Sequence, residues 1–535
     1  MKKIQSLLTH FPKHMKRSFL LCTSFLLLSQ SRISAQSAAN DFKYSWSDDV
    51  VYTPDFLKGN DKDGYIHVGS YERNQITVRH FDNQLHHDAE FSFTPPDIAK
   101  EFTLHKLLNL GGKTYMLYSS FNKSEEKEKL FVQELDSKTG KLTGEVRLLA
   151  SSDIKILPNY EGSNNWLFGK LPEKWWVFVS NDQSKIMIQY RLRPEHINDK
   201  VNSDKIGFIV LDAQLKELWS KVITMPYTES RMNNENYHVD NDGNAYVLAK
   251  IFPAGEGNKS PNFRFEILKY SKDADQVTKI PFSVSGKFAN SVEIGETADN
   301  KVFVTGFYSS RSRMNSAEGF YLFKLNDLAD TVGKTQKWMH AFGKDAMSTD
   351  KDDDEDSGPI NLELHQVVTL PDGAIQLIGE ERSSYVSQAP GSSAGHSSTY
   401  CNSLLVMQIN KDGVVDWMTP IRKKQKSNGL QTDNLSFSSF HKNGNSYIFF
   451  MNNEDNLERS ASARQKLYKG GQQGALECLK IDAKGTVAAP VIISAPFDGG
   501  GFSSIRNFAA VDDDKMIINS SDGRKGSKGA FLSFQ

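Results

Sequence analysis

A two-part phrase recurs along the chain and restricts its fold more strongly than any other feature. The first part is an apolar stretch, a tight polar turn and a second apolar stretch, as where Asp63-Gly64 precedes Tyr65-Ile66-His67-Val68. Asp-Gly and Asn-Gly accept the positive φ angles of two-residue hairpins, so each copy predicts a β-hairpin. Further copies are centred on Asp242-Gly243, Asp372-Gly373 and Asn443-Gly444, with weaker ones at Gly111-Gly112, Asp182-Gln183, Asp299-Asn300 and Asp512-Asp513.

The second part of the phrase is another strand, a turn that begins with Asp or Asn, and a closing strand. Residues 404–409 lead through Asn410-Lys411-Asp412-Gly413 to Trp417, and residues 206–212 run into Leu218-Trp219. The two parts together hold about four short strands, and eight such units follow one another at intervals of 48 to 73 residues. This period and content predict an all-β fold, a single β-propeller of eight four-stranded antiparallel blades.

The last unit, which ends at residues 530–534, is one strand short. We expect residues 42–46 to supply that strand and close the ring, because closure removes the open sheet edges that invite aggregation. A seven-bladed ring with one irregular unit is the nearest alternative. One or two β-sandwiches are a second alternative, although sandwiches do not predict eight copies of one four-strand phrase.

Residues 1–35 are predicted to be an export signal, which leaves residues 36–535 as the propeller domain. Lys16 and Arg17 precede an apolar stretch at 19–28 that is too short to span a bilayer, and Ala35 offers a small residue for cleavage. The alternative is an N-terminal membrane anchor. No later segment is apolar enough to cross a membrane. The expected location is therefore the periplasm, the outer-membrane surface or the extracellular space.

The net charge restricts the classes of partner, and the cysteine content restricts the disulfides. Residues 1–35 hold six of the 64 Lys and Arg residues and none of the 65 Asp and Glu residues, so the remaining chain has a net charge of −7. This balance does not indicate nucleic acid as a partner. Only Cys401 and Cys478 remain after cleavage; they form either one disulfide or two buried thiols.

Two details of the repeat carry a resemblance to known groups. Residues 135–141, Leu-Asp-Ser-Lys-Thr-Gly-Lys, and the spacing of Asp212 and Trp219 resemble the repeats of pyrroloquinoline-quinone-type propellers. The Asp-Gly hairpins are similar to those of NHL-type and related exported propellers, and the ending Ser34-Ala35-Gln36 is similar to many Bacteroidota signals. The resemblance implies a propeller fold and an exported location, and it carries over no cofactor site.

Long insertions gather at one end of the predicted blades. If the strands of a blade are lettered A to D from the axis outward, A–B and C–D turns share one face, and B–C and D–A connections share the other. The long segments fall almost entirely in the second group: 151–164, 194–204, 253–262, 309–318, 343–359, 383–399, 422–433 and 452–471. Binding sites tend to lie on loops carried by a rigid scaffold, so we predict that this long-loop face is functional.

The predicted function is therefore a secreted or envelope-associated, non-enzymatic binding or scaffold protein that holds a protein or glycan partner on the long-loop face. No catalytic residue is predicted. Polar residues where the B strands end form the candidate ligand-binding set: Arg73, Arg191, Arg193, Lys250, Arg311, Glu381, Arg382 and Asn453. The alternative is a carbohydrate-active or other enzyme that uses such groups in the central funnel.

One acidic run suggests a metal. Asp352, Asp354 and Asp356 fall at positions 1, 3 and 5 of a calcium loop, and Glu363 falls at position 12. Position 6, where such a loop needs Gly, is Ser357, so a solvated acidic loop is favoured and calcium remains the alternative. No other cofactor is expected. The basic run 422–426 is expected to lie in solvent and to attract the acidic loop weakly.

Overall fold

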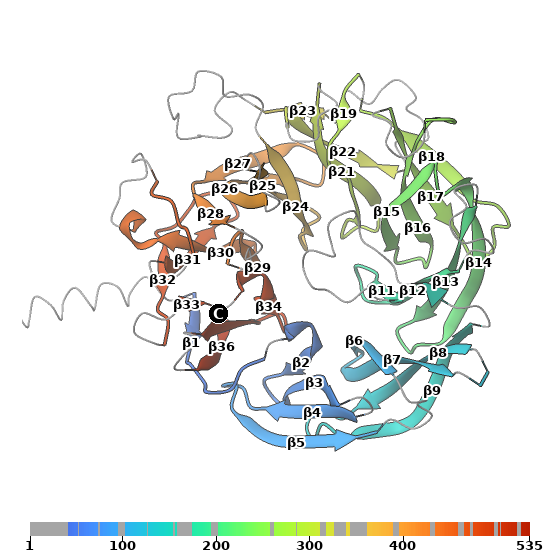
Figure 1. Cartoon of the computed structure of the whole chain (residues 1–535), viewed down its shortest axis with the longest axis horizontal. Coiled ribbons are helices and arrows are strands. Elements are labelled where there is room, and N and C mark those ends of the chain that lie inside the picture. Colours follow the sequence, from blue (N-terminus) through green and yellow to red (C-terminus); the bar gives the residue numbers. More distant parts are fainter. Residues whose placement is uncertain are drawn as a thin grey trace, which may run out of the picture.

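The computed structural model shows a ring of eight antiparallel sheets around a central opening (Figure 1). It describes residues 41–535 except for 52, 73–74, 95–101, 123, 126, 153–155, 158–173, 194–201, 257–261, 285, 311–316, 326–338, 343–360, 389–394, 429–433, 458–464, 471–473, 497–500, 503 and 522–525. The all-β fold and the eight-bladed β-propeller are confirmed, and the seven-bladed and sandwich alternatives are wrong. No helix in the described part of the chain is long and apolar enough to cross a membrane.

The first four blades follow one another along the chain, each written here from its inner to its outer strand. Blade 1 has β2 (Leu57–Asn60), β3 (Gly64–Glu72), β4 (Gln75–Phe81) and β5 (His87–Phe93). Blade 2 has β6 (Phe102–Leu110), β7 (Lys113–Asn122), β8 (Lys127–Leu135) and β9 (Leu142–Ser152). Blade 3 has β10 (Ile156–Leu157) and β11 (Trp175–Val179) on one inner edge, then β12 (Lys185–Leu192), β13 (Ser203–Asp212) and β14 (Glu217–Thr228). Blade 4 has β15 (Met232–Val239), β16 (Ala245–Ile251), β17 (Arg264–Tyr270) and β18 (Thr278–Phe282).

The other four blades complete the ring. Blade 5 has β19 (Phe288–Ala289) and β20 (Glu293–Glu296), then β21 (Val302–Ser309), β22 (Gly319–Lys324) and β23 (Met339–Ala341). Blade 6 has β24 (Leu362–Thr369), β25 (Ile375–Gln388), β26 (Gly395–Ile409) and β27 (Val415–Ile421), with β28 (Gln425–Asn428) paired to β26. Blade 7 has β29 (Ser438–Lys442), β30 (Asn445–Asn453), β31 (Gly474–Ile481) and β32 (Val491–Ile493). Blade 8 has β33 (Gly501–Phe502) and β34 (Ala509–Ala510), then β35 (Lys515–Ser521), β36 (Ser527–Phe534) and β1 (Phe42–Tyr44). Three short 3₁₀ turns are η2 (Pro54–Phe56), η5 (Glu454–Asn456) and η6 (Ile505–Asn507).

The middle strands of each blade are buried on both faces, because a neighbouring blade packs against each side. All eight residues of β21 are buried, whereas most of the outer strand β9 is exposed or half-exposed. A strand covered on both faces needs apolar side chains at odd and even positions alike, so the sequence shows short continuous apolar runs there. This burial explains why the second apolar stretch of each repeat does not alternate.

The predicted A–B hairpin turns occur where the repeat placed them. Gly64, Gly243 and Gly373 have φ angles of 85°, 81° and 86°. A side chain is strained at these angles, and at Gly64 a Cβ atom would also lie 2.4 Å from the His80 ring. The weaker copies use Gln183 and Asn300 at φ angles of 59° and 61°.

The N-terminal strand closes the ring, as the sequence predicted. β1 pairs with β36 in antiparallel register, with Phe42 opposite Phe534 and Tyr44 opposite Leu532. The chain therefore ends beside the strand where its described part begins (Figure 1). The ring of Phe42 lies 5.4 Å from that of Phe534 and 6.3 Å from that of Phe449, which joins the closing strand to the cores of blades 7 and 8.

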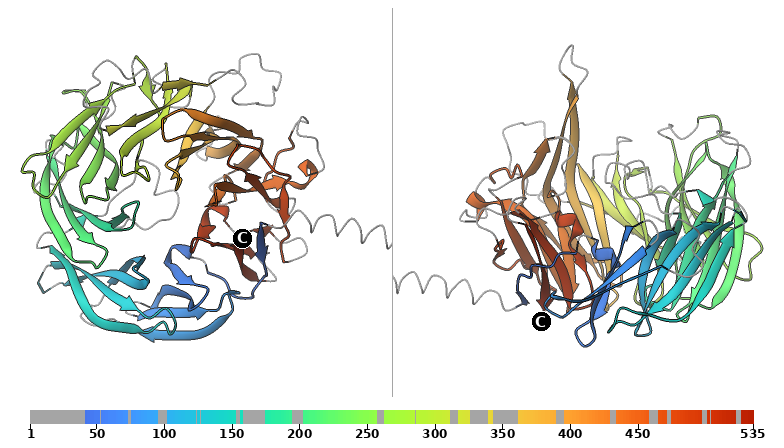
Figure 2. Two further views of the ribbon diagram at one scale, coloured as in Figure 1. Left: turned by 180° about the vertical axis from the view of Figure 1, so that it is seen from behind. Right: turned by 60° about the horizontal axis from the view of Figure 1, so that its bottom comes forward.

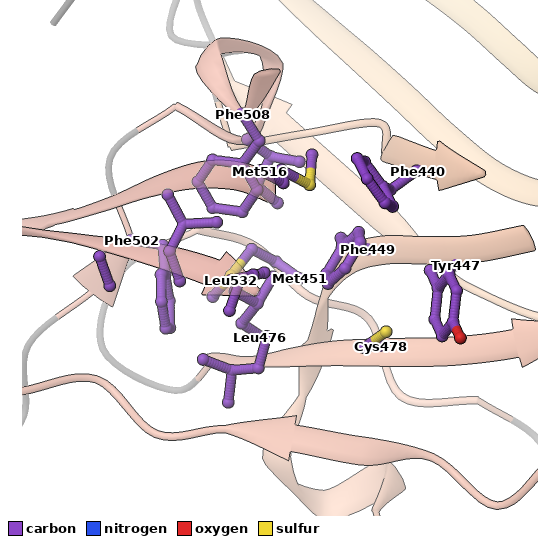
Figure 3. Close-up of a cluster of buried hydrophobic side chains, with 14 of the residues drawn as sticks. Phe440, Tyr447, Phe449, Met451, Leu476, Cys478, Phe502, Phe508, Met516 and Leu532 are labelled. Carbon is purple, nitrogen blue, oxygen red and sulfur yellow. The ribbon is translucent and has the colours of Figure 1, made fainter. Parts of the chain in front are cut away.

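Most of the apolar core lies in clusters between adjacent blades. Figure 3 shows the cluster between blades 7 and 8, where Phe449 and Met451 from β30 pack with Met516 from β35 and Leu532 from β36. Cys478 belongs to this cluster, and both it and Cys401 are buried free thiols rather than a disulfide.

Polar contacts also join neighbouring blades of the ring. Asn236 of blade 4 donates a hydrogen bond of 2.7 Å to Glu293 of blade 5. The Tyr65 hydroxyl of blade 1 donates one of 2.5 Å to Asp512, in the turn before β35 of blade 8. Such bonds hold neighbouring blades in register where the sheets approach one another most closely.

Most of the strand ends that long connections link lie at one end of the ring. The A–B turns are tight in all eight blades, and long B–C connections separate β16 from β17 and β30 from β31. One pair of strands departs from the pattern: the ends of β22 and β23 that the long C–D connection 325–338 links are at the opposite end of the ring. The one-sided arrangement therefore holds for most blades and fails in blade 5.

We expect Phe42→Ala to destabilise the fold by about 3–5 kcal/mol, the usual result of truncating a buried Phe. Phe42 is 4% exposed and packs on both sides of the closure. The measurement is the shift of the urea-unfolding midpoint. Tyr385→Ala is the matched control, because that ring is 60% exposed and its loss should leave the midpoint unchanged. Equal midpoints for Phe42→Ala and the unaltered chain would show that the closing strand contributes little.

Candidate functional site

Blade 6 carries an arm, which we define as residues 382–388 of β25, residues 395–401 of β26, and β28. The two long strands pair as far as Gln388 opposite Gly395, beyond the length of the other blades (Figure 2). Residues 383–399 were expected to form a loop, and this expectation is wrong, since most of them are strand. Pairing with β28 on one side widens the base of the arm.

Cross-strand contacts stiffen the arm. The Tyr385 and Tyr400 rings meet edge to face with centroids 5.9 Å apart, and the Lys426 ammonium lies 5.0 Å from the Tyr400 ring. The Ser384 and Thr399 hydroxyls are 3.2 Å apart. Aromatic and cation–π pairs of this kind favour one arrangement of the hairpin. Tyr385 itself remains 60% exposed, the largest exposed fraction among the bulky apolar and aromatic side chains that the structure describes.

A buried ion pair anchors the arm at its base. The Lys423 ammonium lies 2.5 Å from Glu380, and both side chains are fully buried. Lys423 also donates to the Cys401 carbonyl at 3.0 Å and to the Gln425 side chain at 3.2 Å. The basic run 422–426 was expected to lie in solvent. That expectation is wrong for Lys423, because pairing of β28 with β26 draws this segment against blade 7.

The same network crosses to blade 7. The Gln425 amide donates to the Met451 carbonyl at 2.8 Å, and the Ser436 hydroxyl donates to Glu380 at 2.8 Å. The Ser436 backbone N–H donates to Gln425 at 2.7 Å. Every polar group named here has a partner, which is the condition under which a buried charge is tolerated. The arm is thus fixed to two blades.

His365 links this network to the central opening. It occupies a β-bulge of the inner strand β24, between Leu364 and Gln366, and the inner strands border the opening (Figure 1). Its Nε2 atom lies 3.4 Å from Glu380, and its side chain is 24% exposed. Bulges re-aim side chains and are common beside active sites.

Burial disfavours the charge of Glu380, but the opposite charge of Lys423 and the nearby His365 outweigh it. The pKa of Glu380 therefore lies below its ordinary value, and the carboxylate stays ionised. Glu363, which lies opposite Glu380 across the strands, is solvent-exposed, and partial desolvation together with the Glu380 charge raises its pKa, although Arg382 opposes this. Two neighbouring carboxyls thus have pKa values displaced in opposite directions, an arrangement that assigns acid and base roles in active sites.

Other predicted binding residues have partners within the protein. Arg191 forms ion pairs with Asp204 at 2.6 Å and with Glu229 at 3.0 Å, so its charge is already compensated. Arg193 is exposed just after β12.

Lys250 and Asn453 also contact their own surroundings. The Lys250 ammonium lies 3.9 Å from the Phe263 ring. Asn453 caps the short turn η5, where its side chain accepts from the Asp455 N–H, and it donates to the Leu467 carbonyl. Ordinary capping and packing therefore account for these two residues.

The structure brings Glu381 and Arg382 to the base of the arm, beside Glu380. Burial raises the pKa of Glu381, and Lys423 and Lys424 oppose the increase. Of the predicted calcium ligands, Glu363 lies on β24, within a paired strand. The remaining predicted residues lie outside the described residues: Arg73, Arg311, Asp352, Asp354 and Asp356. Within the described ranges, no group of three or more His, Cys, Asp or Glu residues could hold a metal ion.

Sequence reasoning missed the three residues at the centre of the site, Glu380, His365 and Lys423. Burial of Glu380 could have been predicted from the sequence. Glu380 lies two residues after Ile378 in a predicted strand, so its side chain points to the same buried face. His365 and Lys423 carried no such signal, since their importance depends on a bulge and on the extra strand β28.

Comparison of the sequence with protein families and with curated proteins gives no match. Solved structures with a similar fold include the β-propeller domain of the Trilobed protease from Pyrococcus furiosus, at 10% identity over 79% of this chain and 92% of that one, with a TM-score of 0.34. An oligogalacturonate lyase in complex with manganese is 10% identical over 88% of this chain and 96% of its own, with a TM-score of 0.34. Prolyl oligopeptidase B from Galerina marginata is 8% identical over 94% of this chain but 58% of its own, with a TM-score of 0.37.

Similarity at this level concerns the propeller fold alone and carries no activity, substrate or partner to this chain. The propeller fold that the resemblance to pyrroloquinoline-quinone-type and NHL-type propellers implied is confirmed by the eight sheets of this structure, and membership of either group stays a prediction.

We expect Lys423→Met to destabilise the protein by about 3–5 kcal/mol, because the Glu380 carboxylate would remain buried without its partner. A Glu380→Leu/Lys423→Met double variant should recover most of that loss. In the unaltered chain the depressed pKa means that Glu380 stabilises the fold at neutral pH, and this contribution should disappear as the pH falls below about 4.

Unfolding midpoints of the unaltered chain, the single variant and the double variant, measured from pH 7 to about pH 3, provide the test. Lys484→Met, a change of an exposed lysine, is the control. A single variant as stable as the control at pH 7 would contradict the role assigned to the pair.

Proposed function

We propose that this protein is an exported, non-enzymatic binding protein that holds a protein or glycan partner on its long-loop face. The anchored arm of blade 6 carries the proposal. Its position beyond the neighbouring blades makes it accessible, and its pairing with β28 and blade 7 fixes its conformation. A segment that is already ordered loses little conformational entropy on binding, so its contacts contribute more fully to affinity.

The composition of the arm suits recognition rather than stability. Tyr385 exposes a large ring that no core requires, and Ser384, Ser398 and Thr399 provide adaptable hydrogen-bonding groups. Tyr and Ser are the residues that binding surfaces use for anchoring and for adaptable contacts. Export is the expected location from the segment at residues 1–35 and forms part of the same proposal.

An arm-shortened variant, in which Asn-Gly replaces residues 385–398, should fold normally and lose partner capture. Ser384 and Thr399 pair directly across the hairpin, so a two-residue turn can join them without altering the base. Partner capture by the unaltered chain and by the arm-shortened variant should be quantified by pull-down from the source cells. In the full-length chain, photo-crosslinking from a reactive residue at position 385 should then show that the arm itself contacts the partner.

The control places the same reactive residue at Gln183, in a tight turn on the opposite face. Equal yields and identical products at positions 385 and 183 would contradict the proposal. Unchanged partner capture by the arm-shortened variant would contradict it as well.

A second candidate function, an enzyme with its site beside the central opening, is favoured by one observation. A buried, ionised Glu380 holds the partly exposed His365 at 3.4 Å, and Glu363 with its raised pKa lies on the same strand. An imidazole oriented by a carboxylate can act as a general base, and a raised pKa makes a carboxyl better suited to donate a proton.

If this candidate is correct, a screen of polysaccharides, esters and peptides should find one that the protein cleaves, and His365→Ala should slow that cleavage by about 100-fold or more. His87→Ala, which changes a surface histidine of blade 1, should have no effect. Activity that survives His365→Ala unchanged would exclude the assignment.

A further inference from the structure

The outer wall of the ring contains a groove between blades 3 and 4. It has a volume of about 840 Å³ and lies between β14 and the segment from Tyr270 to Lys279. This volume falls within the range of about 300–1,000 Å³ that is usual for ligand-binding clefts. Glu266, Leu268 and Tyr270 of blade 4 face this side, toward β14. The groove lies on the outer strands, away from the arm of blade 6 (Figure 1).

One wall of the groove is the edge of a sheet. β14 is the outermost strand of blade 3, and within the described residues no further strand pairs with its outer side. Four consecutive residues, 221–224, line the groove. Successive side chains of a strand point to opposite faces of the sheet. Because residues 221–224 all line the groove, the backbone edge of β14 must itself border the groove. Unpaired N–H and C=O groups on such an edge are a template for an added strand.

Positive charge gathers along the groove. Lys221, at the end near the C–D turns, donates to the Ser271 and Ala274 carbonyls at 2.8 Å each. At the other end Lys279 lies 4.5 Å from the Tyr227 ring. Arg231 and Arg264 lie 5.6 and 5.9 Å from the same ring.

The carboxylates near these cations do not balance them. Glu266 is buried, accepts from the Tyr227 hydroxyl at 2.8 Å and pairs with Arg264 at 2.7 Å. Asp275 is the acidic residue among the described residues that line the groove. The described residues that line the groove or surround Tyr227 therefore carry four cations and two carboxylates, on a chain whose net charge after residue 35 is −7. A positive groove on a negative molecule attracts an anionic ligand.

We propose that this groove binds an extended acidic segment of a partner protein, which adds as a strand to the edge of β14 with its carboxylates toward Lys221 and Lys279. The distance from Lys221 to Tyr227 along the strand is about 20 Å, so about six extended residues fit. Pro226, which has no backbone N–H, ends the usable edge near the long-loop face. The site is independent of the arm and of the function proposed for it.

The test uses a fluorescein-labelled peptide, Thr-Glu-Val-Glu-Val-Glu-Thr, in which alternation puts all three carboxylates on one face. Binding is measured by fluorescence anisotropy at low salt. Lys221→Glu/Lys279→Glu should raise the dissociation constant of the peptide by about tenfold or more. The control Lys411→Glu/Lys484→Glu has the same charge change in exposed turns of blades 6 and 7 and should not. The arm-shortened variant should bind the peptide normally, which separates this proposal from the preceding one.

A second peptide, N-methylated at every internal residue, has no N–H left on either strand edge, so it cannot form the ladder of an added strand and should bind at least about tenfold more weakly. Equal binding of the two peptides would overturn strand addition. Charge attraction would then be the whole cause of binding, and an acidic saccharide would bind equally well. Equal weakening in both double variants, or no binding of the parent peptide at about 1 mM, would overturn the site itself.

Discussion

Closure of the ring is the constraint on which the rest of this structure depends. The middle strands of each blade are apolar on both faces, so every blade needs a neighbour on each side. A row of such blades would leave two apolar faces open at its ends. The pairing of β1 with β36 fixes blade 8 with strands from both ends of the chain. The clusters between blades 8 and 1 and between blades 7 and 8 then cover those faces.

A closed ring also determines where function can develop. Its A–B turns are tight and closed by hydrogen bonds within each turn, and Asn241 links the turns of blades 3, 4 and 5, which leaves little freedom at that end. The opposite end carries most of the long connections, and blade 6 uses one of them to extend two strands into the arm. Extension alone would give a marginal two-stranded hairpin. The arm keeps its conformation because β28 adds a third strand and because the buried pair of Glu380 and Lys423 ties its base to blade 7.

That same pair connects the arm with the inner strand. Glu380 receives Lys423 and Ser436 on one side and faces His365 on the other, so a structural anchor also orients a partly exposed imidazole. The outer wall of the ring differs from the inner part, because each outermost strand that the structure describes pairs with another strand on its inner side only. Where β14 meets the cations of blade 4, this exposed edge lies beside uncompensated positive charge. The proposed sites thus follow from two positions in a propeller, the long connections and the outer edges.

The sequence by itself determined the blades, their number and the closing strand, because these depend on local signals. Asp-Gly and Asn-Gly turns set the hairpins, apolar runs set the strands, and a missing last strand pointed to residues 42–46. Tertiary structure alone decided the site, since its residues come from separate segments and their roles depend on contact. Arg191 was predicted to bind a ligand, and only the tertiary structure shows that it forms ion pairs with Asp204 and Glu229. Lys423 was expected to lie in solvent. Pairing of the adjacent strand β28 places it in the interior, where a charge is tolerated only beside an opposite charge.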